Sequence, residues 1–63
     1  MNPKEKAIEL VDKYHKGEPY LSYAGACKCA LIAVEEIIDF LSDDPYYKDY
    51  NFYQQVKTEL TNL

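Results

Sequence analysis

Few side chains in this chain could do acid–base or metal chemistry, and their spacing does not favour it. The only histidine, His15, has no serine or cysteine near it in the sequence that it could activate as a nucleophile. Glu35 and Asp39 lie four residues apart, but no Glu-x-x-His pattern accompanies them to form a di-metal carboxylate site. We therefore interpret His15 as a surface histidine and the two carboxylates as a solvated acidic face. We expect a protein that is not an enzyme and holds no metal or cofactor.

The two cysteines are placed where they can neither form a disulfide nor share a metal. Cys27 and Cys29 lie two residues apart in the strongest helical segment, so their side chains point about 200° away from each other. We interpret Cys27 as a core thiol and expect Cys29 to face the polar side or a neighbour. Free thiols and no recognisable secretory signal predict a cytoplasmic protein. No apolar run reaches the length needed to span a membrane.

Tyrosine is the one residue type in marked excess, with seven in 63 residues. Such rings close the ends of a thin core, form subunit contacts, or stack on a nucleobase for about 1–3 kcal/mol per base. All three interpretations remain open. Under the third, the candidate ligand-binding residues are the tyrosines beside the two predicted connectors and the nearby lysines: Tyr20, Tyr23, Lys28, Tyr46, Tyr47, Lys48 and Tyr50.

The charge balance separates two kinds of partner. The net charge is −4, and all seven basic residues are lysines. Sequence-independent binding of nucleic acid needs a positive surface toward the phosphates, so we expect no nucleic-acid partner. A small anionic ligand held by a few lysines and backbone amides is compatible with this balance.

Cap and breaker residues predict three helices, over about 3–16, 23–41 and 51–61. Asn2 and Glu5 have capping-box spacing at the first helix, and Gly17 provides a left-handed stop. Ser22 is the expected cap of the second helix. Asn51 begins the third helix, with a glutamine at capping-box spacing after it. The resulting fold class is all-α, a single three-helix domain with a long central helix.

The second helix carries a broad apolar face, about half of its circumference, which includes Phe40. Ile32 falls among the charged residues of the other side and does not fit the pattern. Small residues in its first half would let another helix approach closely, either the first helix or a helix of another subunit. The expected oligomer-interface residues are Gly25, Ala26, Ala30, Ile32, Ala33, Ile37 and Phe40.

Chain length provides a reason to expect a homo-oligomer. Folding removes on the order of 6,400 Å² from water, and burying its apolar part contributes roughly 95 kcal/mol. Ordering 63 residues costs roughly the same amount. Because disulfides and metals are unexpected here, self-association remains as the source of additional stability.

Three stretches resemble small uncharacterised helical proteins of Bacteroidetes-type phages and prophages. They read CALIAVEEII from Cys29 to Ile38, KAIELV from Lys6 to Val11, and YQQVKTEL from Tyr53 to Leu60. The resemblance covers nearly the whole chain, although Glu36 and Tyr53 replace commoner choices. It implies a phage accessory protein in the host bacterial cytoplasm and assigns no settled activity.

Together these features support three hypotheses of function. The first is an anti-defence sponge that sequesters a nucleotide second messenger, such as a cyclic nucleotide or an ADP-ribose-type ligand, in pockets between subunits. The second is an inhibitor or adaptor that binds a host protein through the acidic side and exposed tyrosines. The third is a structural helical oligomer with no ligand.

Overall fold

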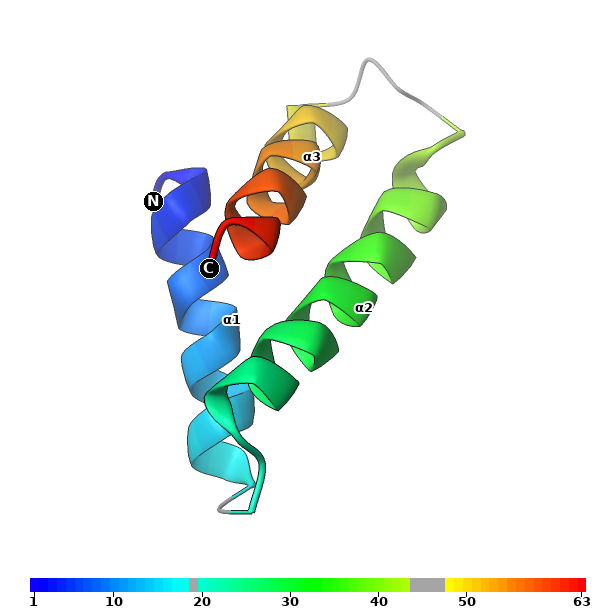
Figure 1. Cartoon of the computed structure of the whole chain (residues 1–63). Coiled ribbons are helices and arrows are strands. Elements are labelled where there is room, and N and C mark those ends of the chain that lie inside the picture. The colour runs from blue at the N-terminus through cyan, green and yellow to red at the C-terminus, as the bar shows by residue number, and fades with distance from the viewer. Residues whose placement is uncertain (19, 44–47) are drawn as a thin grey trace.

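The computed structural model describes residues 1–18, 20–43 and 48–63 and is all-α, as predicted. Helix α1 runs over Pro3–Gly17, α2 over Tyr23–Leu41 and α3 over Lys48–Thr61, and α2 is the longest with 19 residues. Each helix contacts the other two. In Figure 1, α2 runs back along α1, and α3 returns beside both, so that the two chain termini lie near one end. The starts of α2 and α3 lie at opposite ends of the bundle (Figure 1).

The predicted capping box starts α1, but the helix ends differently from the prediction. The Glu5 amide donates to Asn2 Oδ1 at 2.8 Å, and the Asn2 amide donates to Glu5 Oε1 at 3.3 Å. Gly17 is the last helical residue and does not adopt a left-handed conformation. Glu18 instead ends the helix in an extended conformation, with φ −132° and ψ 99°. That is the conformation a residue before a proline prefers, so position 19 in the sequence accounts for the stop.

Ser22 caps α2 as predicted, and Leu21, the residue before it, explains why a glycine is present at position 25. The Gly25 amide donates to Ser22 Oγ at 3.0 Å. A Cβ atom added to Gly25 would lie 2.7 Å from Leu21 Cδ1. Gly25 therefore makes room for the Leu21 side chain of the same chain, which is a different reason from the expected approach of another subunit.

Helix α3 begins at Lys48, three residues earlier than predicted, so the expected cap at Asn51 is wrong. Asn51 lies inside the helix and is exposed. Two neighbours favour the earlier start. Asp49 places a negative charge in the first turn, where the helix dipole favours it. Tyr50 is half-buried and packs against the core, so tertiary contact extends the helix beyond the cap signal.

The core is built from small side chains, and valines are its largest fully buried members. Ala26 and Ala30 have no exposed surface and lie in this core with residues of α1 and α3. Their predicted place in an oligomer interface is therefore wrong, because the alternative of close packing within one chain accounts for them. The complete set of buried apolar residues is Ala7, Val11, Ala26, Ala30, Val34, Ile38, Val56 and Leu60.

Candidate functional site

The predicted ligand-binding residues divide into two groups. Tyr20, 95% exposed, and Tyr23, 47% exposed, lie at the start of α2, with exposed Lys28 in the same half of that helix. Lys48 is exposed at the start of α3, and Tyr50 follows it. Because the two helix starts lie at opposite ends of the bundle (Figure 1), one chain does not bring the two groups together. Tyr46 and Tyr47, also predicted, lie outside the described residues.

The tyrosines also serve different purposes. Tyr50 and Tyr53 are half-buried and pack against the core, which agrees with the interpretation that tyrosines close its ends. Tyr20 makes almost no contact with the rest of the chain, since 95% of its surface is exposed. A ring that stabilises nothing within its own chain is available to a ligand or a partner.

His15 ties the connector between α1 and α2 to the aromatic residues beside it. Its Nδ1 lies 3.1 Å from the Leu21 carbonyl oxygen, and because a carbonyl only accepts, Nδ1 carries the hydrogen in this contact. The imidazole also meets the Tyr23 ring edge to face, with centroids 6.0 Å apart. His15 is exposed, as expected, and it positions the segment before α2. No sequence pattern predicts this contact, because His15 and Leu21 lie on different elements.

Two large apolar side chains project from α2 into solvent. Ile32 is 61% exposed and Phe40 is 83% exposed. They lie eight residues apart, which places them about 80° apart around the helix and on the same side. Phe40 was expected to widen the buried face, and that expectation is wrong within one chain. Together with their neighbours these residues form what we call the outer face of α2, defined as Cys29, Ile32, Ala33, Glu36 and Phe40.

The remaining predicted interface residue on α2, Ile37, is half-buried, as are Ala33 and Cys29. Cys27 is also half-buried and packs against the core, in agreement with its interpretation as a core thiol. Within the described residues, no group of three or more histidine, cysteine or acidic side chains could hold a metal ion. None of the three described helices has both the length and the apolar character to cross a membrane.

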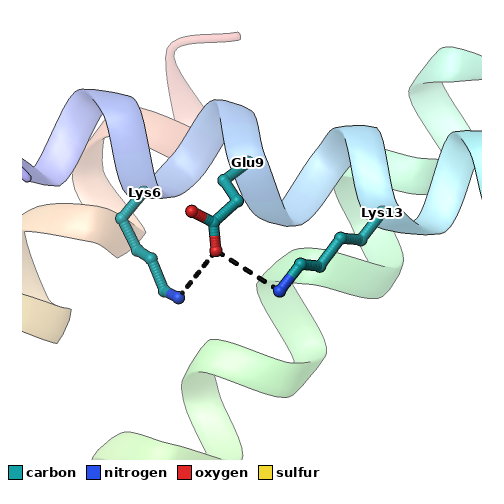
Figure 2. A network of polar contacts seen from close by, with 3 residues as sticks. All are labelled: Lys6, Glu9 and Lys13. Atoms are coloured by element: carbon teal, nitrogen blue, oxygen red, sulfur yellow. Dashed lines mark hydrogen bonds and ion pairs between the residues drawn. The ribbon is translucent and has the colours of Figure 1, made fainter.

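A shallow groove of about 480 Å³ follows the exposed side of α1. Glu9, which lines this groove, accepts from two lysines of α1: Lys6 Nζ and Lys13 Nζ approach Glu9 Oε1 at 3.0 Å and 3.4 Å (Figure 2). The hydrogen bond from Lys6, followed by the one from Lys13, lowers the pKa of Glu9 below its ordinary value of 4.5. The spacing of three and four residues is a sequence signal that could have identified this network. The groove is lined by three carboxylates, Glu5, Glu9 and Asp12, against two lysines, Lys13 and Lys16, so its charge does not favour an anionic ligand.

A smaller depression of about 300 Å³ lies between the N-terminus and α3. It is lined by neutral and charged side chains that include Asn2, Lys4 and Glu59. Asn2 is already committed to the capping box, and Lys4 and Glu59 carry opposite charges. Neither depression therefore gathers the convergent polar groups that a selective small-molecule site uses.

Comparison with protein-family models, curated proteins and solved structures finds no match to this chain.

Proposed function

We propose that this protein acts by binding, as a homo-oligomer, and that it performs no catalysis. The observation that carries the proposal is the exposure of Ile32 and Phe40 on the outer face of α2, beside a core whose largest fully buried residues are valines. Large apolar side chains contribute most when they are buried, and here two of them remain in water. Contact with a second copy would bury both, and α2 would then be the central element of the assembly.

The expected gain is modest. Fully burying a large aliphatic or aromatic side chain stabilises by about 1.5–3 kcal/mol. In proportion to their exposed fractions of 61% and 83%, Ile32 and Phe40 together would contribute roughly 2–4 kcal/mol per copy. Two copies double this to roughly 4–9 kcal/mol, against an association cost of about 4–15 kcal/mol. We therefore expect reversible association whose extent depends on protein concentration.

We further propose that the assembled form sequesters a nucleotide second messenger, in the manner of a phage anti-defence accessory protein. Exposed Tyr20 and Tyr23 offer rings that a nucleobase can stack on, and Lys48 offers a charge for a phosphate. These groups lie at opposite ends of one chain, so a complete site needs residues from two copies. Cyclic nucleotides and ADP-ribose-type molecules combine the base and the phosphates that such a site would recognise.

A second candidate is an inhibitor or adaptor that binds a host protein. The 95% exposure of Tyr20 favours it, because tyrosine is enriched in protein interfaces. The net charge of −4 would favour a basic partner surface. An oligomer with neither ligand nor target is the third candidate.

Sedimentation analysis over a range of protein concentrations tests the oligomer. A mass that rises reversibly with concentration is expected, and a constant monomer mass would refute the proposal.

Calorimetric titration with cyclic dinucleotides, cyclic trinucleotides and ADP-ribose then tests the ligand class. Binding should be lost in Tyr23→Ala and kept in Ile8→Ala, a control on α1. If none of these ligands binds to an assembled protein, sequestration of this class fails and the host-protein candidate takes precedence.

A further inference from the structure

We propose that α2 pairs with α2 of a second copy in antiparallel direction, with the two-fold axis passing beside Ile32. This inference rests on the proposed self-association and specifies its geometry. A symmetric dimer uses the same surface on both copies, so residue i meets residue j and residue j meets residue i. In an antiparallel helix pair, two residues that lie opposite each other have residue numbers with the same sum all along the pair. When the pair is centred on Ile32, that sum is about 64.

Charge along α2 favours this direction. Lys28 lies four residues before Ile32 and Glu36 lies four residues after it, and both are exposed. In the described part of the chain neither of them forms an ion pair, whereas neighbouring Glu35 is occupied by Lys57 at 3.9 Å. Antiparallel pairing places Lys28 level with Glu36 of the partner subunit, and symmetry repeats the contact. In a parallel pair, each charged residue would instead lie opposite the same residue of the partner subunit, and therefore opposite a charge of the same sign.

The apolar residues fit the same register. Ile32 meets Ile32 of the partner subunit at the centre, and this accounts for an isoleucine that lies among charged residues. Phe40, eight residues later, lies on one flank of this contact and is level with the start of α2 in the partner subunit, so pairing would cover part of its exposed ring.

The size of this contact predicts a weak dimer. A helix of 19 residues is about 28 Å long and about 10 Å wide, so one face covers on the order of 300 Å² in projection. Stable interfaces of standard size bury about 800 Å² on each partner, and this chain exposes 4493 Å² in total. Pairing through α2 alone therefore falls well below the standard interface size, and weak, concentration-dependent association is expected.

Antiparallel pairing also brings the divided set of tyrosines and lysines to the same end of the dimer. The start of α2 in one copy comes beside the end of α2 in the other, which is the end of the bundle where α3 begins (Figure 1). Tyr20 and Tyr23 of one copy would then lie at the same end of the dimer as Lys48 of the partner subunit. Tyr23 precedes Ile32 by nine residues and therefore projects from the side of α2 away from the subunit contact. Lys28 would belong to the subunit contact and not to the ligand.

Charge reversal tests the direction of pairing. We would measure dimerisation of Lys28→Glu, Glu36→Lys and the double variant by sedimentation at low salt, from about 10 µM to about 1 mM. Each single variant removes two favourable contacts and adds two unfavourable ones, so each should weaken dimerisation roughly tenfold or more. The double variant exchanges the charges and should return to within about threefold of the wild type. Circular dichroism serves as the folding control, since both residues are exposed.

The outcomes separate this inference from the proposed function. If the wild type remains a monomer throughout, self-association itself fails. If the wild type forms dimers that Phe40→Ser weakens, but the single charge variants do not change dimerisation, self-association stands and antiparallel pairing is overturned. Antiparallel pairing would also be overturned if the double variant dimerised as weakly as the sum of the two single effects predicts. Weakening by each single change together with recovery in the double variant supports it.

Discussion

Replacement of Phe40 by serine distinguishes a side chain that stabilises the fold from one that stabilises an assembly. Phe40 is 83% exposed in one chain, so its removal should change the free energy of unfolding of the dilute monomer by no more than about 0.5 kcal/mol. Truncating a core phenylalanine would instead cost about 3–5 kcal/mol. Urea unfolding followed by circular dichroism, at a concentration where the mass is that of one chain, measures this difference.

The same substitution should have a large effect on association. Burying the exposed 83% of Phe40 contributes roughly 1.2–2.5 kcal/mol per copy, or roughly 2.5–5 kcal/mol for a symmetric pair. Each 1.4 kcal/mol corresponds to a factor of ten, so Phe40→Ser should raise the dimer dissociation constant by roughly two to four orders of magnitude. Ile8→Ser is the matched control, because Ile8 is 39% exposed but lies on α1.

Two results would refute this reasoning. A loss of several kcal/mol in monomer stability would mean that Phe40 is buried within its own chain. If neither Phe40→Ser nor Ile8→Ser changed the dimer dissociation constant, the outer face of α2 would not be the surface through which the copies associate.

Three further substitutions test the packing and the α1 network. Ala30→Leu adds volume to a fully buried position and should destabilise the fold by about 1–3 kcal/mol or more in urea unfolding; a neutral result would mean that Ala30 is not in the core. Gly25→Ala gains about 1 kcal/mol of helix propensity but must displace the Leu21 methyl group, so its net effect should be within about 1 kcal/mol of zero in the same assay. Glu9→Gln should lower stability above pH 4.5, the ordinary pKa of the carboxyl, because the folded-state pKa of Glu9 is depressed. That difference from the wild type should disappear as the pH falls through the lowered pKa, and a difference that persists in acid would contradict it.

Local sequence signals predicted the helices, and they failed where tertiary contacts prevail. The caps at Asn2 and Ser22 are formed by side chains within three residues of their partners, so spacing alone identifies them. The start of α3 was misplaced because packing of Tyr50 against the core extends the helix toward its N-terminus. Glu18 ends α1, where Gly17 had been expected to do so.

The candidate site was predicted less well, because its members are related by the arrangement of the helices. Periodicity placed Ala30 and Phe40 on one broad apolar face, but it could not determine which part of that face the other two helices cover. The structure divides the face, leaving Ala30 with no exposed surface and Phe40 83% exposed. The separation of Tyr20 from Lys48, by contrast, follows from the sequence, because the predicted helix over 23–41 lies between them and is about 28 Å long.

The reason to expect an assembly also changes once the fold is known. A folded monomer of 7.3 kDa exposes about 4,200 Å², and this chain exposes 4493 Å², so the total surface does not by itself require a partner. What differs from an ordinary monomer is the distribution of side-chain sizes. Alanine and valine make up most of the core, whereas Ile32 and Phe40 lie in water on one side of one helix. Since burying a larger apolar side chain contributes more free energy, a second copy that covers this face would be stabilised by the burial of Ile32 and Phe40.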